Sequence, residues 1–97
     1  MKGGNDQPIG AVIRAFFEEN PGIRQKILEV RVERAWGEVC GPAILRYTRN
    51  LFMKGTVLHV SLSSAVLRNE LLLSNSHLID ALNKAVQATA VTDIQFH

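Results

Sequence analysis

The sequence has a single cysteine and no long apolar segment. Cys40 is the only cysteine among 97 residues, so an intrachain disulfide is excluded, as is typical of a protein in a reducing cytosol. No uninterrupted apolar run exceeds the three residues of Leu71-Leu72-Leu73, whereas a membrane span needs about 18 or more. Residues 1–6 lack the apolar core of a signal peptide. These absences predict a cytoplasmic protein without a membrane contact.

Residues that could form a metal site or a catalytic centre are few and dispersed. The candidate metal ligands match no usual ligand spacing; they are Cys40, His59, His77 and His97. Ser61 lies near His59, but no nucleophile-elbow motif surrounds it. Gly37 and Gly41 fit no nucleotide-binding fingerprint. We therefore expect no enzyme, no metal, no cofactor and no small-molecule substrate. Next to Trp36 and Val39, Cys40 is expected to be a buried, unreactive thiol rather than a reactive one.

Length and composition indicate one small domain. The chain is 46% apolar and 21% charged, which is ordinary for a globular protein. A domain of this size hides roughly 60–70% of its unfolded surface, enough for one core. No repeat or linker divides the sequence. We expect residues 1–7, which are polar and Gly-rich, to be a flexible N-terminus, and residues 8–97 to form a single domain.

Apolar spacing predicts two helices before residue 42. In the first, from about Pro8 to Glu19, Asp6 can cap the start and Pro8 occupies the first turn. Asn20-Pro21-Gly22 then breaks the chain. The second helix begins near Pro21 and stops or bends at Gly41-Pro42. Its apolar stripe contains Leu28, Val32, Ala35, Trp36 and Val39.

The second half of the chain alternates between strand and helix patterns. Residues 47–53 and 56–63 are expected to form a hairpin, with Gly55 in a G1 bulge at the turn. A helical region then starts at Ser63 or Ser64, and its polar segment Ser74-Asn75-Ser76 favours a break over one long helix. Residues 91–96 resemble a short strand. The predicted fold is α+β, in the order α-α-β-β-α(-α)-β, with a small three-stranded sheet and helices on one face.

Aromatic residues make up only 6% of the chain. Because Trp36 lies on the stripe of the second helix, we interpret it as a core residue, with a base-stacking or partner contact as the alternative. Tyr47 and Phe52 could pack between sheet and helices, or could stack a base beside Arg46 and Arg49. The residues expected in the structural core are Phe16, Trp36, Leu58, Val60, Leu71 and Leu82.

Positive charge is concentrated in the middle third of the sequence. From Arg24 to Lys54 the chain has seven basic and three acidic residues, or +4, whereas the remainder has four basic and six acidic residues, or −2. A locally basic surface suits a polyanion or an acidic protein, although it can also be a solvated face. The candidate nucleic-acid-binding residues, which could form one basic edge, are Arg31, Arg34, Arg46, Arg49 and Lys54. The sequence assigns no residue to a protein partner.

Several segments occur in the order found in one bacterial family. They are Ala35-Trp36-Gly37-Glu38-Val39-Cys40-Gly41, Ile44 and Thr48, residues 51–60, Ser63-Ser64-Ala65, Glu70-Leu71, Leu78-Ile79, Leu82-Asn83 and Ile94-Gln95-Phe96. Over residues 9–97 this pattern resembles the DciA family. The resemblance implies a KH-like, type II-like domain that associates with the replicative DNA helicase, helps to load it and has affinity for single-stranded DNA.

Three differences from related patterns bear on these expectations. KH domains that clamp nucleic acid use a Gly-x-x-Gly loop between two helices, where this sequence has Ser74-Asn75-Ser76-His77. Gln95 replaces the basic residue usual in the terminal strand of the family. The missing Gly-x-x-Gly loop argues against sequence-specific RNA binding by the usual KH route. Because this sequence also shows no basic extension like that of many family members, we expect only weak DNA binding. The alternatives are a KH-like RNA-binding or ribosome-associated protein and a pure protein-interaction module.

Overall fold

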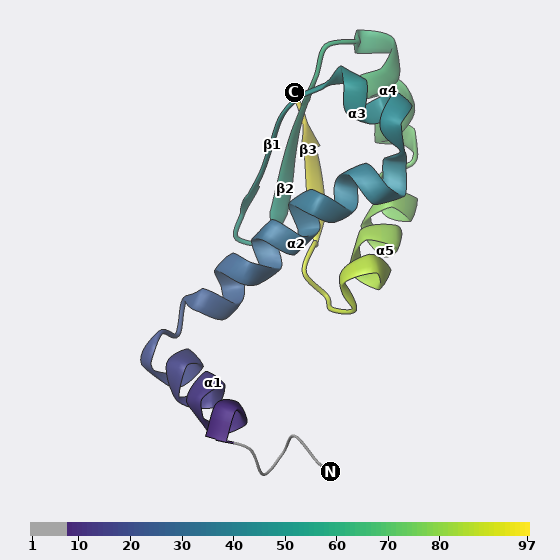
Figure 1. The fold of residues 1–97 in the computed structure, drawn as a ribbon. Helices are drawn as coiled ribbons and strands as arrows, with labels where there is room; N and C mark the ends of the chain where they lie inside the picture. Colours follow the sequence, from purple (N-terminus) through teal and green to yellow (C-terminus); the bar gives the residue numbers. More distant parts are fainter. Residues whose placement is uncertain (1–7) are drawn as a thin grey trace.

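The protein is described by a computed structural model that covers residues 8–97 (Figure 1). The elements are α1 (Pro8–Glu19), α2 (Ile23–Cys40), α3 (Pro42–Tyr47), β1 (Thr48–Lys54), β2 (Val57–Leu62), α4 (Ala65–Leu73), α5 (Asn75–Val86) and β3 (Asp93–Phe96). The α+β class and the expected element order are confirmed, with the short helix α3 as an addition. The expectation for residues 1–7 lies outside the described residues.

The three strands form one mixed sheet in the order β1-β2-β3. β1 is antiparallel to β2, and β3 is parallel to β2, to which α4 and α5 provide the crossover. α2 and α5 pack against each other and cover the same side of the sheet (Figure 1). The core lies between these two layers and consists of Val32, Ala35, Trp36, Met53, Leu58, Val60, Leu62, Leu71, Leu82, Val86, Ala90, Val91 and Ile94.

Trp36 lies at the centre of this core. Its side chain is fully buried, and its ring centroid is 6.4 Å from that of Phe96 on β3. The other residues expected in the core that are buried are Leu58, Val60, Leu71 and Leu82. The expectation for Phe16 is wrong, because half of its side chain is exposed. α1 projects away from the sheet (Figure 1) and has no buried residue, so its apolar stripe has no core to pack on.

The hairpin differs from the expected geometry at both ends of β1. Lys54 pairs directly with Val57, so the loop contains two residues, and Gly55 has a φ of 63° at the first of them. This is the pattern of a type II′ turn, and the predicted G1 bulge at Gly55 is wrong. The register instead shifts between Thr48 and Asn50. In a regular strand Thr48 would face away from Leu51 and Met53, because side chains alternate between the two faces. The irregularity turns Thr48 to the core side, which Leu51 and Met53 also face.

The helical region after β2 is interrupted as expected. Ser64 caps α4, since its hydroxyl accepts a hydrogen bond of 3.1 Å from the backbone N–H of Leu67. α4 ends at Leu73, and α5 begins at Asn75. The side chain of Asn83 then fixes the loop before β3, because its Oδ1 accepts from the N–H groups of Ala90 and Val91 and its Nδ2 donates to the Val91 carbonyl.

Candidate nucleic-acid and partner surfaces

The five candidate nucleic-acid-binding residues are all exposed. Arg31 and Arg34 belong to α2, Arg46 lies in the last turn of α3, and Arg49 and Lys54 belong to β1. Among residues 8–97 the one ion pair within 4.0 Å joins Lys26 to Glu29, at 3.9 Å. The five positive charges are therefore not neutralised by close carboxylates of the described chain, and they remain able to attract an anion.

These residues occupy separate places on the surface. Arg46 and Arg49 flank the junction of α3 and β1, whereas Lys54 ends β1 about 17 Å away at the usual rise of a strand. Arg31 has a second role, because its guanidinium donates a 3.0 Å hydrogen bond to the Val86 carbonyl at the end of α5. That bond ties α2 to α5 and neutralises part of the negative end of the α5 dipole. Arg46 and Arg49 are thus two exposed candidates that lie three residues apart at one junction, whereas Arg31, three residues from Arg34, is engaged with α5.

A row of three rings lies on the sheet face opposite the helices. The Phe52 and His59 rings are parallel with centroids 4.7 Å apart, and the His59 and His97 rings are parallel at 5.3 Å. His59 Nδ1 and His97 Nε2 are 3.1 Å apart and share a hydrogen bond. Of the two alternatives left open for Phe52, packing between sheet and helices is wrong, because its side chain is 40% exposed on this open face. The alternation of apolar and polar residues in the strand could have placed His59 on the open face. The row itself depends on which residues lie opposite one another in neighbouring strands, and the sequence does not predict that register.

A second group of exposed side chains is apolar and is distributed over α1 and the part of α2 from Ile23 to Arg34. We call residues 8–34 the α1–α2 arm. Its most exposed large apolar residues are Ile9, Val12, Ile13, Phe16, Ile27 and Val30. The sequence interpretation missed this surface, because an apolar stripe has the same spacing whether it faces a core or solvent.

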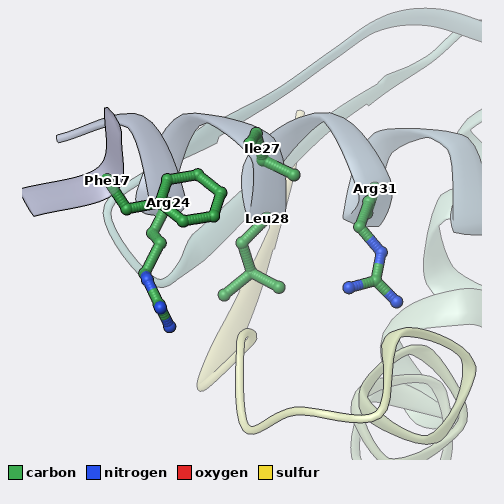
Figure 2. Close-up of a pocket in the computed structure, with 5 residues that line it drawn as sticks. All are labelled: Phe17, Arg24, Ile27, Leu28 and Arg31. Carbon is green, nitrogen blue, oxygen red and sulfur yellow. The ribbon is translucent and has the colours of Figure 1, made fainter. Parts of the chain in front are cut away.

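Two hollows lie along the arm. One, of about 320 Å³, is lined by Phe17, Arg24, Ile27, Leu28 and Arg31 (Figure 2). The other, of about 340 Å³, is lined by Ile23, Lys26, Ile27, Val30, Arg31 and Arg34. The guanidinium carbon of Arg24 lies 5.0 Å from the centroid of the Phe17 ring, a cation–π contact across the bend between α1 and α2. In Figure 2 the side chains of Arg24, Leu28 and Arg31 project to the same side of α2.

The titratable groups offer little reactive chemistry. Burial raises the pKa of the Cys40 thiol to about 11, so the thiol is protonated at neutral pH. The Gln95 side chain donates to the Asp93 carboxylate at 2.9 Å and lowers the pKa of Asp93. Within residues 8–97 no three His, Cys, Asp or Glu side chains lie close enough to hold a metal ion. None of the helices in that range has the length and apolarity to cross a membrane.

Fold and surface together define a small α+β domain that carries exposed basic residues and an uncovered apolar arm. The family profile described as "Dna[CI] antecedent, DciA" matches residues 8–96, nearly the whole chain. The protein therefore belongs to the DciA family, which is associated with DNA replication and helicase loading. A comparison with curated protein sequences finds no match.

Proposed function

We propose that this chain is a non-enzymatic accessory protein of DNA replication that binds the replicative DNA helicase and assists its loading. The observation that carries the proposal is the family match, which includes every helix and strand from α1 to β3. The uncovered surfaces support it, because a helicase partner needs a contact area and the arm offers exposed apolar side chains.

The proposal includes weak contacts with single-stranded DNA. Arg46 and Arg49, with help from Arg34 and Lys54, offer exposed positive charges without close carboxylates in the described chain. About three or four phosphate contacts would give a log–log salt slope of roughly −2 to −3 for a single strand. The Phe52 ring, exposed on the open sheet face, could add one stacking contact with a base. Together these contacts would give a modest affinity for single-stranded DNA that falls as the salt concentration rises.

The direct test is co-purification of the chain with its cognate replicative helicase, with and without single-stranded DNA. A complex at low micromolar concentration is expected in at least one condition. No complex at tens of micromolar in both conditions would reject the loading role for this chain.

A parallel titration with single-stranded DNA and RNA over a range of salt separates the alternatives. A clear preference for RNA would favour a KH-like RNA-binding or ribosome-associated role. A flat curve for both nucleic acids would leave a pure protein-interaction module.

A further inference from the structure

The α1–α2 arm is an apolar surface that residues 8–97 leave without a partner. Its six most exposed apolar side chains are each 44–67% exposed, and α1 buries none of its residues. A helix of 12 residues is marginal in water unless an apolar face packs against something. Soluble monomers seldom expose contiguous apolar patches of more than a few hundred Å². The exposed apolar side chains of the arm therefore indicate a surface that contacts a partner.

The hollows along the arm indicate the charge of what covers it. All charged residues that line them are basic, and none is acidic: Arg24, Lys26, Arg31 and Arg34. The remaining lining residues are apolar: Phe17, Ile23, Ile27, Leu28 and Val30. An occupant that complements this lining has an apolar face flanked by carboxylates.

The shape indicates the kind of segment. Ile23, Ile27 and Val30 follow one another at the i, i+4, i+7 spacing by which helices pack in a groove. The part of α2 from Ile23 to Arg34 is about 18 Å long at the usual helical rise, which matches a partner helix of three to four turns.

The helix that carries this groove, α2, is held in place by two hydrogen bonds to the hairpin. Gln25 Nε2 donates to the Gly55 carbonyl at 3.1 Å, and the Glu33 carboxylate accepts from the Met53 N–H at 3.3 Å. A rigid receptor loses less entropy when it binds.

A second copy of this chain is a poorer occupant. The segment that it would supply is α1, which has the required apolar stripe. However, α1 carries Arg14 near its middle and places its acidic residues, Glu18 and Glu19, together at its C-terminal end. Arg14 would face the basic rim, whereas a partner with carboxylates along its length would pair with that rim throughout.

We propose that the α1–α2 arm docks an acidic amphipathic helix of a partner protein, with Ile27 and Val30 as apolar anchors and Arg24 and Arg34 as its electrostatic rim. This inference deepens the proposed function: the identification of the partner protein as the replicative helicase rests on that proposal. The docking chemistry itself can be measured without the helicase.

The first measurement uses designed peptides and fluorescence anisotropy. One labelled helical peptide of 14 residues has leucines at i, i+3, i+4 and i+7 and glutamates elsewhere; its counterpart has lysines in place of the glutamates. The acidic peptide is expected to bind at least tenfold more tightly than the basic one, and Ile27→Glu is expected to weaken it at least tenfold, as loss of an interface anchor does. Arg24→Glu with Arg34→Glu should remove the preference for the acidic peptide.

Val66→Glu is the matched control, because Val66 is 76% exposed on α4, outside the arm. It should leave peptide binding unchanged. Equal binding of the two peptides, or equal loss in Ile27→Glu and Val66→Glu, would overturn the proposed docking site. Circular dichroism of each variant checks that the fold is retained.

The second measurement repeats helicase co-purification with the same variants. Loss of the complex in Ile27→Glu but not in Val66→Glu supports the arm as the helicase contact. If wild type binds the acidic peptide but no helicase, the docking site stands and the proposed function fails. If all variants bind helicase equally, the arm is not the helicase contact. A concentration-dependent dimer in light scattering that Ile27→Glu abolishes would show a second copy as the occupant and would overturn the inference.

Discussion

The indole Nε1 of Trp36 donates a hydrogen bond of 3.2 Å to Oγ1 of Thr48. Thr48 Oγ1 in turn donates to the carbonyl of Ile44 at 3.1 Å, so the buried tryptophan is connected to α3 and to the first residue of β1. The irregular register after Thr48 turns its hydroxyl toward the core. A polar N–H in an otherwise apolar centre is thereby satisfied, which is the usual condition for a buried tryptophan.

Thr48→Val should destabilise the domain by about 1–3 kcal/mol, because the volume is kept while the indole N–H loses its acceptor. Trp36→Ala should cost about 3–5 kcal/mol, as large aromatic deletions in cores do. Urea denaturation of both variants measures these free energies of unfolding. In a Trp36→Phe background, which has no indole N–H, Thr48→Val should cost clearly less. Equal costs in the two backgrounds would show that the hydrogen bond does not stabilise the fold.

Local sequence patterns predicted the elements of this fold better than their surroundings. The bounds of α1 coincide with the expected Pro8 to Glu19, because apolar spacing and a proline in the first turn are local signals. The same spacing placed Phe16 in the core, yet what a stripe packs against is decided by tertiary structure. α3 was missed because Gly41-Pro42 was interpreted as a stop, whereas proline also starts helices.

In the candidate sites, too, local features could be predicted from the sequence, whereas features that depend on tertiary structure could not. Charge counts pointed to Arg46 and Arg49, which are exposed as a nucleic-acid contact requires. The ring row of Phe52, His59 and His97 could not be predicted, because its members come from three segments. The two-residue turn at Gly55 places Phe52 opposite His59, and the parallel pairing of β2 with β3 brings His97 beside them. The hydrogen bond of Arg31 to Val86 joins residues 55 positions apart, a distance over which sequence patterns carry no signal.

Asn83 should be the most sensitive polar residue of α5. Asn83→Leu leaves the N–H groups of Ala90 and Val91 without an acceptor, and each buried donor left unpaired costs about 1–3 kcal/mol. Asn83→Asp keeps the acceptor but loses the donor to the Val91 carbonyl, so it should be the milder change at neutral pH. Thermal unfolding ranks the two variants. A larger loss in Asn83→Asp than in Asn83→Leu would contradict the assigned roles of the amide.

Cys40 should react slowly with iodoacetamide in the folded protein. Burial raises its pKa from 9.0 to about 11, which lowers the thiolate fraction at neutral pH by about 100-fold. The alkylation rate, followed by mass spectrometry, should keep rising up to about pH 11 in the native chain but level off near pH 9 in urea. A native rate that levels off near pH 9 would refute the assigned burial.

The same pKa shift has a consequence for stability. Because the folded-state pKa is the higher one, the contribution of the protonated thiol is fully present below pH 9 and is lost as the pH rises to 11. Cys40→Ala should therefore lose less stability than wild type over that interval. Because other groups also titrate in this interval, the quantity to measure is the difference in free energy of unfolding between wild type and Cys40→Ala at each pH.

Reversal of Arg46 and Arg49 to Glu should weaken binding of single-stranded DNA and flatten its log–log salt slope by about 1 to 1.5, because two phosphate contacts are lost. Exposed charges contribute little to stability, so the unfolding midpoint should change little. Arg14→Glu with Lys84→Glu is the matched control, since it changes the net charge equally at two other exposed positions. Fluorescence anisotropy of a labelled oligonucleotide from 50 to about 300 mM salt measures the slopes. If control and test variants lose the same affinity and the same slope, net charge rather than the junction of α3 and β1 attracts the DNA, and the site at Arg46 and Arg49 is rejected.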